Sequence, residues 1–212
     1  MKQFTSSHKY LLDSLYSKHS PVTVVVGPAG SGKTYISCTA AIRQLHKKKY
    51  DKIVITRPAK TADEDQGYLP GGVNNKMNPY MKPLYDCFLD NMNHAQMKKY
   101  IDTNVIEICP LGYMRGRTFH NTFIVADECQ NTTVSQMKML LTRLGENSRM
   151  VITGDLLQSD LDDNNNGLKD IVHRCEKQFS EKDECIINLV KFQSEDIIRS
   201  DVIKQILELY DE

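Results

Sequence analysis

The feature that most constrains the fold is a β-branched run that leads directly into a glycine-rich turn. Residues 22–26 read Val-Thr-Val-Val-Val, and short runs of this kind suit strands that are buried on both faces of a sheet. Three glycines punctuate the next six residues, and a helical stretch follows from about residue 33 to residue 48. A strand, a tight turn and a helix in this order predict the first half of a parallel βαβ unit.

The rest of the chain repeats this alternation. The further strand candidates are 53–56, 105–108, 122–126, 150–153 and 184–189, and the further helix candidates are 6–18, 79–92, 94–101, 134–144, 168–179 and 196–210. The alternation predicts a three-layer α/β fold with a mostly parallel sheet, and we expect one domain over residues 1–212. Ligands of such sheets bind at the carboxyl ends of the strands, so candidate site residues are sought there.

Charge and composition narrow the functional classes. The 27 basic and 27 acidic residues cancel, which argues against a passive binder of the nucleic-acid backbone. No run approaches about 20 apolar residues and the N-terminus has no apolar signal core, so we expect a cytoplasmic protein that does not contact a membrane. The six cysteines include no C-x-x-C pair, and reduced core thiols are expected.

The glycine-rich turn fits the phosphate-binding pattern G-x-x-x-x-G-K-[ST] without a mismatch. Glycines let backbone N–H groups turn toward phosphate oxygens, and the following helix directs its N-terminal dipole at the same anion. We expect Lys33 to reach the β- and γ-phosphates and the Thr34 hydroxyl to bind Mg²⁺. A turn that merely connects a strand to a helix is the alternative. The nucleotide-binding residues are therefore predicted to be Gly27, Pro28, Ala29, Gly30, Ser31, Gly32, Lys33 and Thr34.

Two neighbouring acids follow the apolar run 123–126. Asp127 is expected to bind Mg²⁺, through water, and Glu128 to polarise the attacking water as a general base. A solvated acidic turn is the alternative reading of the pair. Because a small-molecule kinase needs no second acid here, Glu128 favours hydrolysis over phosphoryl transfer.

A polar turn, Thr153-Gly154-Asp155-Leu156-Leu157-Gln158, follows the next strand. A G-D-x-x-Q segment in this place is similar to one found in superfamily-1 helicase-like ATPases. The similarity implies that Gln158 contacts the γ-phosphate and reports its loss, although a plain turn would have the same composition.

Over residues 5–210 the chain resembles the PhoH-like family of P-loop ATPases. The resembling segments are 27–34, 55–59, 67–71, 78–86, 110–118, 126–132, 153–155 and 195–200. The resemblance implies a RecA-like core related to one half of a superfamily-1 helicase. It also implies a ring-shaped homo-oligomer, expected to be a hexamer, and a link to single-stranded RNA or DNA.

The resemblance also suggests roles for residues outside the glycine-rich turn, the acidic pair and the polar turn. His8 stands where the family usually has a glutamine that reads adenine, and ATP remains the favoured nucleotide. Arg199 is the candidate arginine finger, lent by a neighbouring subunit, and Arg115 and Arg117 are the next candidates. An ordinary surface arginine is the alternative reading of Arg199.

A nucleic-acid track is the last expectation. Helicase-like proteins contact the strand backbone after their second strand, and ordinary loop packing is the alternative. Basic side chains would contact the phosphates and a tyrosine would offer an aromatic platform for a base. The candidates are Arg57, Lys60, Tyr68, Arg115 and Arg117.

Together these patterns predict an oligomeric ATPase that uses ATP and Mg²⁺ and couples hydrolysis to movement on, or remodelling of, single-stranded nucleic acid. A nucleotide-dependent switch or adaptor without motor activity is the alternative. A small-molecule kinase is disfavoured by the acidic pair and by the polar turn that ends at Gln158.

Overall fold

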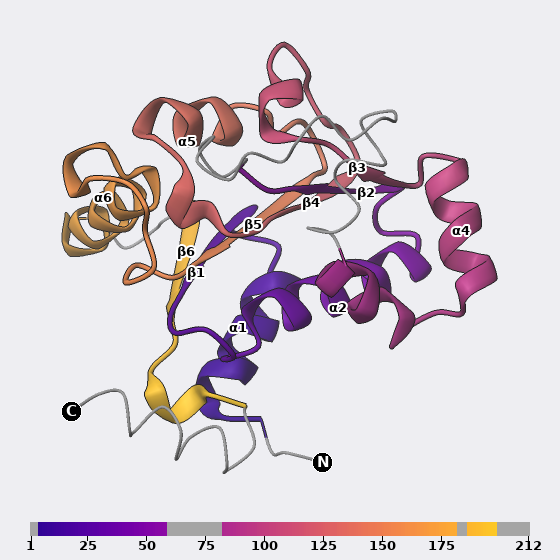
Figure 1. Cartoon of the computed structure of the whole chain (residues 1–212), viewed down its shortest axis with the longest axis horizontal. Coiled ribbons are helices and arrows are strands. Elements are labelled where there is room, and N and C mark those ends of the chain that lie inside the picture. The colour runs from indigo at the N-terminus through magenta and orange to yellow at the C-terminus, as the bar shows by residue number, and fades with distance from the viewer. Residues whose placement is uncertain (1–3, 59–81, 182–185, 199–212) are drawn as a thin grey trace.

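The computed structural model describes residues 4–58, 82–181 and 186–198, and its centre is a six-stranded parallel sheet (Figure 1). The strands lie in the order β3-β2-β4-β5-β1-β6, and every neighbouring pair is parallel. Their bounds are β1 Val22–Val26, β2 Lys52–Thr56, β3 Ile106–Ile108, β4 Thr122–Ala126, β5 Arg149–Gly154 and β6 Ile187–Lys191. The predicted α/β fold with a parallel sheet is confirmed.

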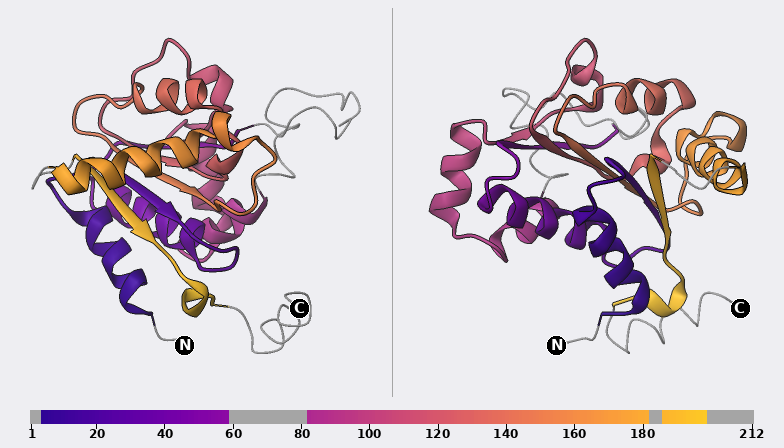
Figure 2. Two further views of the ribbon diagram at one scale, coloured as in Figure 1. Left: turned by 90° about the vertical axis from the view of Figure 1, so that its left-hand side faces the viewer. Right: turned by 180° about the vertical axis from the view of Figure 1, so that it is seen from behind.

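Helices cover both faces of this sheet (Figure 2). One face carries α1 Ser6–Tyr16, α2 Lys33–His46 and α4 His94–Asp102, together with a helical segment at residues 82–89. The other face carries α5 Val134–Leu141 and α6 Gly167–Glu181. The result is the three-layer arrangement that alternating strands and helices predict.

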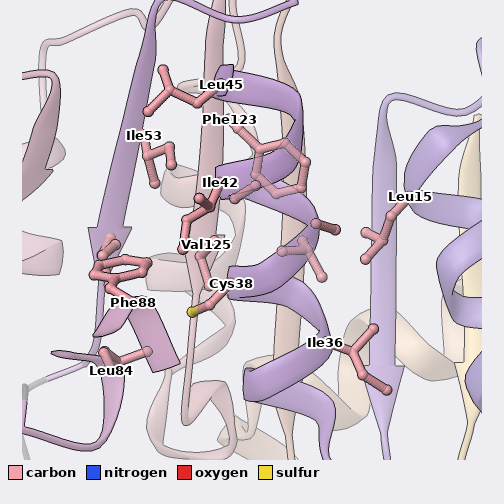
Figure 3. Close-up of a cluster of buried hydrophobic side chains, with 14 of the residues drawn as sticks. Leu15, Ile36, Cys38, Ile42, Leu45, Ile53, Leu84, Phe88, Phe123 and Val125 are labelled. Carbon is pink, nitrogen blue, oxygen red and sulfur yellow. The ribbon is translucent and has the colours of Figure 1, made fainter. Parts of the chain in front are cut away.

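The alternation of side chains along each strand produces two cores, one per face. In β4, Phe123 and Val125 point toward α2, whereas Ile124 and Ala126 belong to the core under α5 and α6. Figure 3 shows α2 packed on the first core, where Ile36 and Ile42 lie among strand and helix side chains. All five residues of β1 and of β4 are buried, as expected for strands covered on both sides.

The strand order determines which chain segments meet at the carboxyl edge of the sheet. β5 lies between β1 and β4, with Val26 opposite Gly154 and Ala126 opposite Ile152. β2 pairs with β4 on the other side, with Thr56 opposite Ala126. The glycine-rich turn, the acidic pair, the polar turn and Arg57 therefore emerge side by side.

The C-terminal part differs most from the sequence-based expectation. The last strand is β6 at Ile187–Lys191 rather than 184–189, because its pairing with β1 places Ile187 opposite Val22. No helix begins at residue 196. Instead, Ser194–Asp196 form a 3₁₀ turn, in which the Asp196 carboxylate accepts hydrogen bonds from the Gln193 backbone N–H and the Thr5 hydroxyl. Residues 199–210 of the expected helix lie outside the described residues.

Two further expectations concern cysteines and membranes. The described residues include five cysteines, and four of them are buried: Cys38, Cys109, Cys129 and Cys175. Across the part of the chain that the structure describes, no helix combines the length and the apolar character needed to cross a membrane.

Candidate active site

The glycine-rich turn between β1 and α2 has a backbone that only glycine fits at two positions. A Cβ atom on Gly27 would lie 2.6 Å from the Cβ of Phe192 and 2.7 Å from its carbonyl oxygen. Gly32, which caps α2, has a φ of 82°, in the left-handed region that side chains disfavour. The motif glycines are therefore required by the shape of the loop, as the sequence pattern predicts.

Residues from both ends of the chain support this loop. The His8 Nδ1 atom accepts a hydrogen bond from the Thr5 N–H, so the Nε2–H donates to the Ser31 carbonyl at 2.9 Å. The Ile198 N–H donates to the Gly30 carbonyl at 3.0 Å. His8 is fully buried and both of its ring nitrogens are engaged, so its position does not support the expected contact with the base. Its observed role is to hold the loop.

Lys33 lies inside the curve of the loop. Its Nζ atom donates to the carbonyl oxygens of Gly27 and Pro28 at 2.7 and 2.8 Å. Burial lowers the pKa of the Lys33 ammonium, while the negative charges of Asp155 and Glu128 act to raise it. Phosphate oxygens are stronger acceptors for an ammonium than peptide carbonyls, so Lys33 is positioned to exchange one set for the other.

Asp127 is the most heavily bonded side chain of the site and is only 2% exposed. Its Oδ1 atom accepts from the hydroxyls of Thr34 at 2.8 Å and Thr153 at 2.5 Å. Its Oδ2 atom accepts from Arg57, through Nε at 3.0 Å and Nη2 at 2.5 Å. Arg57 was expected on a nucleic-acid track, but the structure pairs it with the candidate metal-binding carboxylate.

The donor set around Asp127 fits magnesium. Mg²⁺ prefers oxygen ligands, and in nucleotide sites it uses one or two protein oxygens together with phosphates and water. The Thr34 hydroxyl and the Asp127 carboxylate, in direct contact, supply such oxygens. Among the described residues no group of three or more His, Cys, Asp or Glu side chains could hold a metal ion.

Glu128 lies at the start of a 3₁₀ turn, Cys129–Asn131, in an unusual backbone conformation. Its φ of 57° lies in the left-handed region, and strained backbone of this kind clusters at functional sites. Its side chain is exposed and accepts a hydrogen bond from Gln130 Nε2 at 2.6 Å. The Gln130 Oε1 atom accepts in turn from the Asp155 N–H.

Gln130 is therefore a site residue to which the sequence analysis assigned no role. It is 3% exposed and connects the acid of one strand end to the polar turn of the next. The signal was present, because a glutamine two residues after an acidic pair is near enough to bond to it. Its bond to Asp155 depends on the neighbouring position of β5, which no local pattern shows.

Gly154 joins β5 to the polar turn and has no room for a side chain. A Cβ atom there would lie 2.5 Å from Leu168 and 2.8 Å from the Gln130 Oε1 atom. Within the turn, the Leu157 N–H donates to the Asp155 carboxylate, and Gln158 is exposed toward solvent.

A cleft of about 370 Å³ brings these segments together. It is lined by Ala29, Gly30, Gly32, Lys33, Thr34, Tyr35, Arg57, Pro83, Cys87, Asp127, Glu128, Gly154, Asp155 and Gln158. The predicted residues Lys33, Thr34, Asp127, Glu128 and Gln158 thus share one cavity, together with Arg57 and with Ala29, Gly30 and Gly32 of the loop.

The predicted arginines Arg115 and Arg117 lie outside the lining of this cleft. Arg117 forms a two-point ion pair with Glu107, at 2.6 and 2.9 Å, and lies over the Phe119 ring. Arg115 is exposed, and neither arginine lines the cleft. Lys60, Tyr68 and Arg199 lie outside the described residues.

The family described as PhoH-like protein matches residues 1–211. "Protein PhoH" of Escherichia coli (strain K12) is 42% identical over 187 residues, which cover 87% of this chain and 51% of that protein. The "PhoH-like protein" of Bacillus subtilis (strain 168) is 39% identical over 194 residues, covering 92% of this chain and 59% of the relative.

Solved structures of two helicases are also similar. "Pif1 helicase from Candida albicans" has a TM-score of 0.47 and 14% identity, and the match covers 100% of this chain and 44% of that one. "Bacteroides Pif1 bound to ssDNA" has a TM-score of 0.41 and 13% identity, covering 100% and 46%. The chain spans about half the length of the curated relatives it matches. On the family match over residues 1–211 and relatives about 40% identical, the chain belongs to the PhoH-like protein family.

Proposed function

We propose that the chain hydrolyses ATP to ADP and phosphate with Mg²⁺. The observation that carries the proposal is the shared cleft, in which the P-loop lysine, the Thr34–Asp127 contact and the Glu128 carboxylate face one volume. A phosphate-binding loop alone would support nucleotide binding only. The second acid beside the metal-binding acid supports hydrolysis.

Each residue has a distinct part in the proposed reaction. The loop N–H groups and Lys33 bind the phosphates. Thr34 and Asp127 would hold the metal, which would neutralise the charge that develops on the phosphates. Glu128 accepts a proton from the attacking water, and Gln130 fixes the carboxylate for this step. Gln158, on the rim of the same cleft, contacts the γ-phosphate.

The preference for ATP rests on the family resemblance, because His8 is occupied by the loop. Displacement of a fluorescent ATP analogue by ATP and by GTP tests it. At least tenfold tighter binding of ATP, which corresponds to about 1.4 kcal/mol, supports the preference, and equal binding contradicts it.

An arginine finger would come from a second subunit. On the family resemblance, we propose that Arg199 of an adjacent subunit completes the site in a ring, with six subunits expected.

Single-stranded nucleic acid is the proposed polymer, and the turn Leu111–Met114 offers the best surface for it. Tyr113 is 65% exposed and Arg115 is exposed beside it, while Leu111 and Met114 anchor the turn in the core. Apart from the chain neighbours, no atom of the described residues lies within 4 Å of the positions that Cβ atoms would take on Gly112 and Gly116, which leaves space beside both glycines. An aromatic face next to a cation suits a stacked base and its phosphate.

The test is the rate of ATP hydrolysis with and without single-stranded RNA and DNA, on protein of measured oligomeric mass. We expect one of the polymers to stimulate the rate, and the ratio of stimulated to unstimulated rates to fall in Tyr113→Ala. Tyr10→Ala is the matched control, because Tyr10 is 54% exposed on α1. If neither RNA nor DNA changes the rate of ATP hydrolysis, the result would contradict the proposed motor activity and favour a nucleotide-dependent adaptor.

A further inference from the structure

We propose that Arg57 is a built-in cation that occupies the metal-binding carboxylate of Asp127 and that a divalent cation must displace. The proposal rests on the function proposed above in one respect, the assignment of Asp127 to the metal. It adds a role for Arg57. Because Arg57 competes for the carboxylate, the protein without nucleotide would bind the metal weakly, and metal binding would be coupled to nucleotide binding.

Backbone geometry fixes the ion pair. Arg57 is the first residue after β2 and Asp127 the first after β4, and these strands are neighbours with Thr56 opposite Ala126. The Asp127 N–H also donates to the Thr56 carbonyl at 2.9 Å. The two side chains therefore start from adjacent, hydrogen-bonded strand ends, unlike a surface pair that two flexible side chains form by chance.

The carboxylate of Asp127 has little capacity left for another partner. A carboxylate has about four lone-pair sites, and the four donors are the Thr34 hydroxyl, the Thr153 hydroxyl and two N–H groups of Arg57. A divalent cation can bind this carboxylate only if at least one of these donors leaves.

Arg57 is the donor that a metal would displace. Its two hydrogen bonds to Asp127 are both on Oδ2, and a guanidinium and a metal ion on the same oxygen would repel each other. Thr34 can stay, because its hydroxyl oxygen is itself a metal ligand. Thr153 is buried in β5 and contacts the other oxygen.

Burial explains why a resident cation is needed. Asp127 is 2% exposed and the Arg57 side chain 16%, and a buried carboxylate without a partner is strongly destabilising. Arg57 supplies the compensating charge until the metal takes it over. Because Arg57 lines the same cleft, a triphosphate that enters with the metal offers new acceptors to the released guanidinium. A bare metal ion offers none, and so it competes poorly.

The direct test is Mn²⁺ binding without nucleotide, measured as the loss of the free-ion EPR signal, in the wild-type chain and in Arg57→Gln. Mn²⁺ accepts the same oxygen ligands as Mg²⁺. We expect Arg57→Gln to bind Mn²⁺ at least about tenfold more tightly, and Asp127→Asn in the same background to remove the gain. Arg117→Gln is the control, because it removes an arginine–carboxylate pair outside the cleft. Equal or weaker Mn²⁺ binding by Arg57→Gln overturns the proposal.

A second readout serves if Arg57→Gln is unstable. Arg57→Lys keeps the positive charge but offers fewer hydrogen bonds to Asp127. Its affinity for Mn²⁺ should therefore lie between those of the wild-type chain and Arg57→Gln. Added Mn²⁺ should also raise the Tm of Arg57→Gln more than that of the wild-type chain, since the metal replaces a missing charge. Equal increases in Tm would contradict the displacement.

The two proposals fail separately. Suppose that the wild-type chain hydrolyses no ATP, but that Arg57→Gln binds Mn²⁺ more tightly in a manner that depends on Asp127. This result would support the role of Arg57 and contradict the proposed ATP hydrolysis. ATP hydrolysis by the wild type with unchanged Mn²⁺ affinity in the variant would do the reverse.

Discussion

Lys33 and Glu128 show how two charged residues in one cleft are held differently. Lys33 is partly buried and bonded to carbonyls of its own loop, and burial lowers its pKa. Glu128 is exposed. Its carboxylate accepts a hydrogen bond from Gln130, and its backbone is in the left-handed region. The lysine is therefore suited to binding, and the glutamate to contact with water.

Replacing Lys33 with alanine should weaken triphosphate binding. The variant loses charge-assisted hydrogen bonds, each of which contributes about 1.5–3 kcal/mol, so we expect affinity to fall by about tenfold to a hundredfold. Equilibrium titration with a fluorescent ATP analogue measures the change. Lys98→Ala, at an exposed position on α4, is the control and should bind as the wild type does. Unchanged affinity in Lys33→Ala would remove the lysine from the phosphate site.

At the scale of elements, Glu107 ties β3 to its surroundings. Its carboxylate forms ion pairs with Arg117, which follows the Leu111–Met114 turn, and with Lys52 at the start of β2. These contacts, the Arg117 hydrogen bonds first, lower the pKa of Glu107 from its ordinary value of 4.5 to about 2, while burial opposes the shift. Arg117 therefore links the segment after the Leu111–Met114 turn to this edge of the sheet.

The sign of the resulting pH dependence follows from the lowered pKa. The ion pairs stabilise the fold fully above pH 4.5 and lose this contribution as pH falls toward about 2. The difference in free energy of unfolding between the wild type and Glu107→Gln should therefore shrink over that range. Urea denaturation at several pH values measures it. The pH dependence should be smaller in an Arg117→Gln background, and a difference that is constant with pH would contradict the assignment.

Which site residues could be predicted depended on whether their geometry is local. Gly27 to Thr34 and the pair Asp127–Glu128 each lie in one continuous segment directly after a strand, so their position at the sheet edge follows from the fold class. The partners of His8, Arg57 and Arg117 come from remote segments, and those partners decide whether a side chain is free to bind a ligand. Sequence position alone could not reveal them.

The ends of the strands could likewise be predicted only where the sequence pattern is local. β1 and β4 were predicted with their observed ends, because buried β-branched runs define them. β6 is an edge strand whose position is set by its pairing with β1, and its sequence pattern was too weak to fix the ends.

At the scale of the whole molecule, the two ends of the chain converge on the phosphate-binding loop. α1 and the segment after β6 lie side by side in Figure 1, where Thr5 bonds to Asp196 and both His8 and Ile198 bond to the loop. The residue that follows Ile198 is Arg199, the proposed finger. A change at either chain end is therefore expected to reach the loop.

If Arg199 acts across a subunit interface, two inactive variants should restore activity when mixed. The Arg199→Ala variant retains Lys33, and the Lys33→Ala variant retains Arg199. At an interface between the two variants, an intact Lys33 and an intact Arg199 can therefore meet in one site. ATP hydrolysis is measured after mixing, with mass measurements to show that mixed oligomers form. Each variant mixed with itself is the control. No gain in activity from mixed oligomers would contradict a finger supplied in trans.

The most direct measurement is phosphate release from ATP with Mg²⁺ by the wild type and by Glu128→Gln, together with ATP binding by both. Glu146→Gln, at an exposed acid outside the cleft, is the control. The proposed mechanism predicts that the wild type turns over, that Glu128→Gln still binds ATP, and that its turnover falls by about 10²–10⁴-fold because the general base is lost. A wild-type protein of verified assembly that releases no phosphate, or a variant that turns over at the wild-type rate, would contradict it.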